Sequence, residues 1–152
     1  MSTARQAFTM IELVFVIVII GILASISIPK LAATRMDAKL AAKAQNIATA
    51  ANEIASYALS RDGSDANLSH MSRAIHNMIA TNDATDLGNY TVNVKVEEIT
   101  DCIIVQITNV GSNTETLSLL YGNSTNSNCD RLRSLIDTAA YPILLHGTHI
   151  IY

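Results

Sequence analysis

A single carboxylate inside an apolar run is the residue best placed to do chemistry in this chain. The run from Phe8 to Ile28 is about 21 residues long, which at the rise of a helix spans roughly 30 Å, and Glu12 is its one charged side chain. A carboxylate costs about 2.5–3.5 kcal/mol at the centre of a bilayer and less near an interface, so it is seldom there without a partner. Glu12 is therefore expected to have a partner. The simpler alternative is a protonated or snorkelling acid in a plain membrane anchor.

The two cysteines form the second pair with chemical potential. Cys102 and Cys129 lie in the C-terminal half, and their spacing does not fit a zinc knuckle, which needs close pairs. A disulfide in an oxidising compartment fits better, and would close a loop of about 28 residues worth about 3–4 kcal/mol. Two free buried thiols are the alternative. Without a C-x-x-C motif or a nearby base, neither cysteine is expected to be catalytic.

The remaining reactive side chains predict neither an enzyme nor a metal or cofactor site. The histidines His70, His76, His146 and His149 form no ligand motif and are interpreted as surface or satisfied core residues. The closely spaced carboxylates of residues 62–67 lack a full set of calcium ligands, which favours a capped turn. The sequence also has no phosphate-binding glycine loop, nucleophile elbow or H-E-x-x-H motif.

One long helix is predicted to carry Glu12. Beyond the apolar run, apolar residues recur at spacings of three and four and form one stripe: Met36, Leu40, Ala44, Ile47, Ala51, Ile54 and Ala58. The helix is about 50 residues long, and residues 61–65 end it. Gly21 and Pro29 weaken it locally. They are either tolerated irregularities of a membrane helix or the ends of a stretch that loosens during assembly.

The rest of the chain reads as a small sheet domain. The expected elements are a short helix over Leu68–Ile79, a turn-rich segment Thr81–Asn89, strands at Tyr90–Val96, Cys102–Thr108 and Thr114–Tyr121, a short helix at Asp130–Asp137 and an edge strand or packed tail at Pro142–Tyr152. The predicted fold class is α+β. A long N-terminal helix, half transmembrane and half amphipathic, packs on a small antiparallel sheet.

Length and charge limit the functions open to the chain. Its 152 residues suit one domain, or one domain plus an appendage, and a net charge of −3 argues against a general nucleic-acid binder. Arg131 and Arg133, beside an Asn-rich loop, are the one candidate for a local basic patch. Binding of nucleic acid therefore stays open.

The N-terminal motif resembles a known processing and assembly segment. It reads Ala7-Phe8-Thr9-Met10-Ile11-Glu12-Leu13, continues as Val14-Phe15-Val16-Ile17-Val18-Ile19-Ile20-Gly21-Ile22-Leu23-Ala24 and closes with Ile28-Pro29. This is similar to the start of type IV pilins and of the pseudopilins of type II secretion and competence systems. The resemblance covers about the first 30 residues. Downstream, only the pilin-like architecture matches.

The resemblance implies roles for individual residues. A prepilin peptidase would cleave between Ala7 and Phe8 and methylate the new amine of Phe8. Glu12 would then pair with the Phe8 amine of a neighbouring subunit in the filament core. The family usually has glycine at the position of Ala7, so cleavage is where this chain departs from the pattern. In pilin-like proteins a disulfide often ties the variable C-terminal region to the sheet, as Cys102 and Cys129 would.

The same resemblance implies a domain plan and a set of partners. Residues 1–7 are a leader peptide, 8–29 a transmembrane and assembly helix, and 30–152 a periplasmic globular domain. The partners are the prepilin peptidase, other pilin or pseudopilin subunits, an inner-membrane assembly platform and membrane lipid. The implied function is that of a structural subunit, single-pass in the inner membrane and then part of an extracytoplasmic filament.

The distribution of basic residues opposes this orientation. Four follow the span (Lys30, Arg35, Lys39 and Lys43) and one, Arg5, precedes it, so the positive-inside rule would place the C-terminal domain in the cytoplasm. The motif and the cysteine pair favour the periplasm. Two other functions stay open: a minor pilin that binds DNA or another ligand at a filament tip, and a non-polymerising single-span membrane protein.

Overall fold

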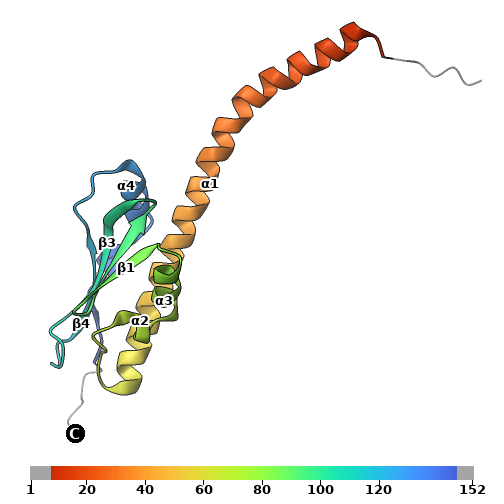
Figure 1. The fold of residues 1–152 in the computed structure, drawn as a ribbon. Helices are drawn as coiled ribbons and strands as arrows, with labels where there is room; N and C mark the ends of the chain where they lie inside the picture. The colour runs from red at the N-terminus through yellow and green to blue at the C-terminus, as the bar shows by residue number, and fades with distance from the viewer. Residues whose placement is uncertain (1–7, 147–152) are drawn as a thin grey trace, which may run out of the picture. The chain divides into compact units, whose positions relative to one another are not determined.

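The computed structural model describes residues 8–146, apart from the side chains of Pro29, Ala32 and Thr100. Two compact units divide the chain between Ala38 and Lys39. The helix α1, Met10–Arg61, is 52 residues long and contributes to both (Figure 1). The remaining elements all belong to the second unit. The α+β prediction, a long N-terminal helix packed with a small antiparallel sheet, is confirmed and the fold is pilin-like.

In the described part of the first unit, the large apolar side chains from Phe8 to Ile28 are exposed. Phe8 is 85% exposed, Phe15 67% and Ile28 66%. Helical backbone runs without a break through Gly21 and Pro29. This is the one helix among the described residues that is long and apolar enough to cross a membrane, by length and composition alone.

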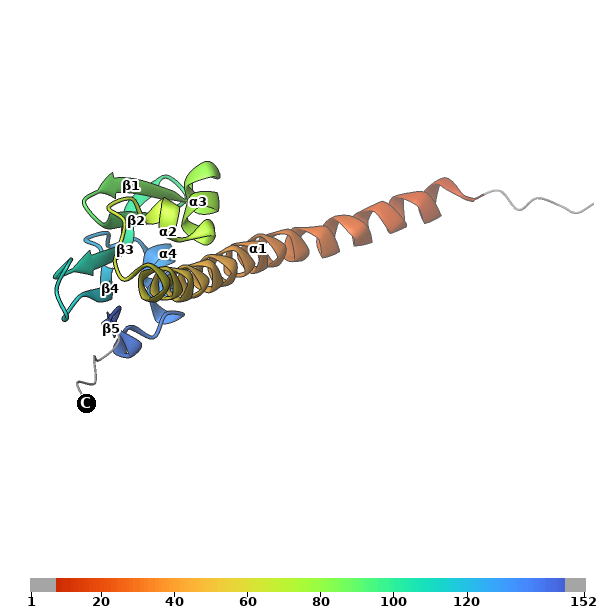
Figure 2. The same cartoon turned by 90° about the horizontal axis from the view of Figure 1, so that it is seen from below.

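The second half of α1 buries the predicted stripe. Leu40, Ile47, Ala51, Ile54 and Ala58 are each at most 1% exposed, whereas Ala44 and Met36 are half-buried. In Figure 2, where this half of the helix is seen almost end-on, the strands lie beside it. The 3.6-residue period of the helix puts these side chains on one face, and that face forms the core with the sheet.

Helix α1 ends where the sequence predicts, through a left-handed residue. Asp62 has φ +54°, and the amide of Gly63 donates a 3.2 Å hydrogen bond to the carbonyl of Ala58. This is the six-to-one bond of a Schellman motif, which satisfies a carbonyl left free by the end of the helix.

The predicted helix over Leu68–Ile79 is two helices, α2 (Leu68–Met71) and α3 (Arg73–Ala80). Ser72 between them is extended, with φ −135°. Its hydroxyl accepts from the amide of Ile75 at 3.1 Å and donates to Glu53 of α1 at 2.7 Å. Glu53 also accepts from the amide of Ala74 at 3.0 Å, and these bonds hold the pKa of its carboxyl below the ordinary value.

The sheet has five antiparallel strands in sequential order. They are β1 (Ala84–Gly88), β2 (Thr91–Val96), β3 (Ile99–Thr108), β4 (Thr116–Tyr121) and β5 (Ile143–Leu144). The strands predicted for β2, β3 and β4 are confirmed. Strand β1 lies within the segment that was predicted to contain only turns. Its Ala, Asp and Gly residues favour strands poorly, so the sequence gives no strand signal there. The strand forms because it pairs with β2.

Apolar and polar side chains alternate along the strands, so one face of the sheet is apolar and buried. The inward side chains are at most 5% exposed: Val92, Val94, Val96, Ile103, Val105, Ile107, Leu117 and Leu119. On the other face, Thr108 and Thr116 pair across β3 and β4 with their hydroxyl oxygens 3.0 Å apart. One apolar and one largely polar face is the usual pattern of an antiparallel sheet covered on one side.

The helix α4 (Ser127–Ser134) joins the C-terminal region to β3. A disulfide connects its Cys129 to Cys102, with the Cα atoms 5.2 Å apart and both residues fully buried. The helix begins three residues before the predicted one, because Asn126 caps it by accepting from the amide of Asn128 at 2.8 Å. A short 3₁₀ turn, η1 (Thr138–Ala140), leads into β5.

Loss of the disulfide should destabilise the second unit without affecting α1's apolar half. In the chain-entropy model, closing this loop contributes about 3–4 kcal/mol to the free energy of unfolding. The double variant Cys102→Ser/Cys129→Ser is therefore expected to unfold at lower denaturant concentration than the oxidised wild type, measured on the full chain in detergent micelles. Reductant should lower the wild-type midpoint to that of the variant and leave the variant unchanged. Equal midpoints for all three samples would contradict a stabilising bridge.

Candidate functional site

The first turn of α1 gives Glu12 a partner within its own chain. Thr9 is the residue before the helix, and Glu12 is the third helical residue. Glu12 Oε2 accepts from the Thr9 amide at 2.8 Å and from the Thr9 hydroxyl at 2.8 Å, and the Glu12 amide donates to Thr9 Oγ1 at 3.4 Å. This reciprocal arrangement is a capping box, which satisfies backbone amides that the helix leaves free.

The capping box places the carboxylate beside the position where a new amine would appear. Phe8 directly precedes Thr9, so cleavage of the bond before Phe8 would create a cationic amine one residue from the amide that Glu12 binds. A carboxylate at a helix N-terminus also interacts favourably with the helix dipole. The geometry therefore holds a negative charge at the start of an exposed apolar helix.

The other predicted assembly residues give less structural information. Ala7 lies outside the described residues. A Cβ added to Gly21 would meet no atom within 4 Å, so packing within the subunit does not require glycine there. Pro29 has helical backbone. A role for these two residues in loosening the helix stays a prediction.

The capping box is not among the features predicted above, although its sequence signal is local. Thr9-x-x-Glu12 directly before an apolar run is the sequence pattern of a helix start. The turn at residues 62–67 was predicted as a capped turn, and this is confirmed. Asp65 accepts from the amide of Asn67 at 2.8 Å, and Asn67 accepts from the amide of Ser69 at 3.0 Å.

The arginines proposed as a basic patch have structural partners. Arg133 donates to the carbonyls of Cys102 at 3.2 Å and Gly122 at 2.7 Å, and to the carboxylate of Asp130 at 3.0 Å. Its guanidinium also lies 5.6 Å from the centre of the Tyr121 ring. Arg133 thus fixes the region around the disulfide, and Arg131 has an interaction partner as well. The partners of Arg133 all lie in the second unit, and a nucleic-acid interface at these two arginines stays a prediction.

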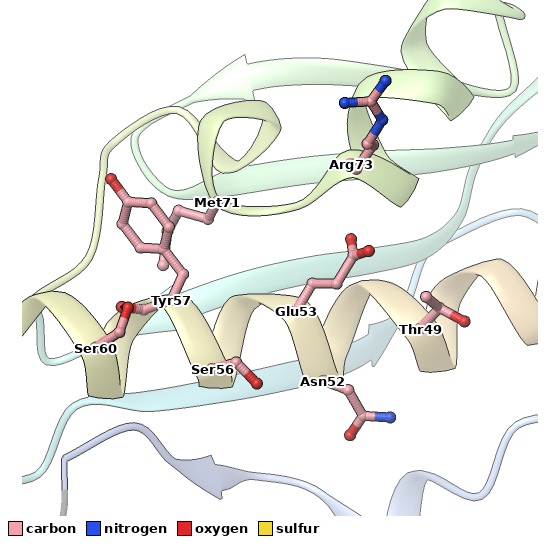
Figure 3. Close-up of a pocket in the computed structure, with 8 residues that line it drawn as sticks. All are labelled: Thr49, Asn52, Glu53, Ser56, Tyr57, Ser60, Met71 and Arg73. Carbon is pink, nitrogen blue, oxygen red and sulfur yellow. The ribbon is translucent and has the colours of Figure 1, made fainter.

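A groove in the second unit does not converge on a reactive group. It has a volume of about 690 Å³ and runs between α1 and the α2–α3 segment (Figure 3). Glu53 points across it, but its Oε2 is already bonded to Ser72 and Ala74, while Arg73 points away from α1. Within residues 8–146, no three His, Cys, Asp or Glu side chains are grouped to hold a metal ion.

Comparison with known proteins assigns the N-terminal segment. Residues 2–28 match the family model described as the prokaryotic N-terminal methylation motif, which is the signal of type IV pilins and pseudopilins. No curated protein and no solved structure matches the chain. The motif indicates a type IV pilin-like, prepilin-processed protein, of a class whose members are structural subunits.

The capping box predicts that Thr9 holds the first turn through its hydroxyl. Thr9→Val should destabilise this turn by about 1 kcal/mol, the usual cost of losing an N-cap side chain. Exchange of the Leu13 amide, which donates to the Thr9 carbonyl at 3.2 Å, should then be about fivefold faster in the full chain in detergent micelles. Thr9→Ser keeps the hydroxyl and should match the wild type. Wild-type exchange in Thr9→Val would show that the hydroxyl does not stabilise the turn.

Proposed function

We propose that this chain is a type IV pilin-like structural subunit, made as a prepilin, cleaved between Ala7 and Phe8, and polymerised through α1 into a pilus or pseudopilus. The observation that carries the proposal is the methylation motif on residues 2–28. Two features of the fold support it. The apolar half of α1 is exposed, and its first turn presents a carboxylate next to the proposed cleavage point.

The exposed half of α1 needs two successive environments. Before assembly, membrane lipid covers its apolar side chains, and residues 8–29 are long enough to span the hydrocarbon core. After assembly, the same side chains are covered by the helices of neighbouring subunits. A subunit that leaves the membrane exchanges contacts with lipid for contacts with other apolar helices, so apolar burial alone favours no particular register. Close helix packing and polar pairs therefore decide the register of the filament.

Glu12 supplies the polar pair. Within one subunit, Thr9 already provides donors to Oε2, which lowers the cost of holding the carboxylate near hydrocarbon. In the filament, the amine of a neighbour's Phe8 approaches Glu12. A matched pair is tolerated in a low-dielectric core and an unmatched charge is not, so the pair selects the register at which each subunit docks.

The second unit is the extracytoplasmic domain in this proposal. The disulfide between Cys102 and Cys129 supports that orientation, because such bonds persist in oxidising compartments. The prepilin peptidase and an inner-membrane assembly platform are the partners expected at the membrane. Residues 30–152 then face outward, with the sheet domain on the surface of the filament.

The test is a variant that removes the carboxylate and leaves processing intact. Glu12→Ala should still be cleaved before Phe8, while its incorporation into sedimentable filaments should fall at least 100-fold, because an unpaired buried charge costs about 3–5 kcal/mol. Processing is read from the N-terminal peptide mass, and incorporation from the pelleted fraction. Glu98→Ala, at an exposed carboxylate of the second unit, is the matched control and should assemble normally. Wild-type incorporation of Glu12→Ala would defeat the proposed pairing.

A further inference from the structure

A buried carboxylate in the second unit lies outside the assembly segment and its proposed role. Glu115, just before β4, is fully buried. Its Oε2 accepts from the amide of Gly111 at 3.0 Å and contacts His146 Nε2 at 2.9 Å. Burying a carboxylate costs free energy unless it is paired and hydrogen-bonded. The contacts with Gly111 and His146 therefore offset the cost of burying Glu115.

His146 connects Glu115 to a third segment of the chain. Its other ring nitrogen, Nδ1, lies 3.6 Å from Asp62 Oδ1 in the turn that ends α1. The imidazole is 17% exposed, whereas Asp62 is 98% exposed. The imidazole of His146, which follows β5 and Leu145, thus lies between two carboxylates. One belongs to the turn after α1 and the other to the residue just before β4.

Few other contacts hold the C-terminal strand on the sheet. Strand β5 has two residues, which pair with Thr116 and Leu117 of β4. One further backbone bond, from the amide of Leu145 to the carbonyl of Glu115, measures 2.9 Å, and the Leu145 side chain is fully buried. Because the ladder is this short, the side-chain cluster makes up a large share of the polar contacts at this edge.

We propose that Asp62, Glu115 and His146 form a proton-sensitive latch that holds β5 on the edge of the sheet while His146 is protonated and weakens when His146 loses its proton. The charged imidazole lies between two carboxylates and can donate from both nitrogens. The neutral ring keeps one donor and loses both charge interactions. The latch does not depend on the proposed assembly function.

The electrostatics of the cluster agree with this geometry. The hydrogen bond to Glu115 raises the pKa of His146 above its ordinary 6.5, and burial only partly opposes this. Burial raises the pKa of Glu115, but the neighbouring Ser64, His146 and Gly111 outweigh it, so this pKa lies below its ordinary 4.5.

The sign of each shift fixes the pH window. The His146 contribution is complete below 6.5 and is lost as pH rises through the raised pKa. The Glu115 contribution is complete above 4.5 and is lost as pH falls through the lowered pKa. The latch is therefore strongest between these two ordinary values and weakens on either side.

No other titratable group takes part among the described residues around His146. Strand β5 and Leu145 carry none, and Asp65, in the same turn as Asp62, contacts His70 Nδ1 at 3.1 Å. Release of β5 would uncover the backbone of Thr116 and Leu117 and the apolar side chain of Leu145. An uncovered strand edge is a surface on which another strand can pair.

Amide exchange on the full chain in detergent micelles tests the latch. The readout is the protection factor of the Leu145 amide, corrected for the intrinsic pH dependence of exchange. The reference is the Ile107 amide, which bonds Tyr90 on the far side of β3. Between about pH 6 and about pH 9, Leu145 protection should fall about fivefold relative to Ile107, the usual difference between a charged and a neutral hydrogen bond.

Two variants separate the latch from other sources of pH dependence. His146→Gln keeps a donor but cannot gain a charge, so its Leu145 protection should not change over this range. His70→Gln removes the neighbouring histidine, which also contacts an aspartate, and should behave like the wild type. Constant protection in the wild type would overturn the latch, and so would an equal fall in His146→Gln.

Discussion

The structure depends on one constraint: the apolar first half of α1 is exposed in the single chain and must be covered by other molecules. Each large side chain from Phe8 to Ile28 would gain about 1.5–3 kcal/mol if it were fully buried. A subunit with this helix bare in water would aggregate, so lipid or other helices must cover it. The polar groups follow the same constraint. The one carboxylate in this half lies in the first turn and is bonded to Thr9, instead of lying unpartnered at mid-span.

The second half of the same helix has a different partner, the sheet of its own chain. Ile47 and Ile54 are buried in the core of the second unit, and Glu53, on a neighbouring face, caps α3. One continuous helix thus has two halves with different partners. The second half packs on the sheet of its own chain, and the apolar first half must be covered by lipid or by other helices. The disulfide and Arg133 stabilise the C-terminal region independently of both.

Sequence patterns predicted the features that arise from local periodicity. The long helix, its end near Arg61 and the strands β2, β3 and β4 follow from spacings of three to four and of two residues. Contacts between distant segments could not be predicted in this way. The predicted second helix is divided at Ser72, whose hydroxyl donates to Glu53, 19 positions away, and β1 depends on pairing with β2. The sequence alone predicts His146 as a surface or satisfied core residue, because Asp62 and Glu115 reach it only in the fold. Thr9 is different, since its capping pattern was visible in the sequence and was not used.

Processing of the chain as a prepilin can be read from the mass of the N-terminal peptide of the protein purified from its native membrane. The expected peptide begins at Phe8 and carries one extra methyl group on its amine. This result would also show that alanine at position 7 is accepted by the peptidase. A peptide that still begins at Met1, from cells in which the prepilin peptidase is active, would show that the chain is not processed as a prepilin and is a simple membrane anchor.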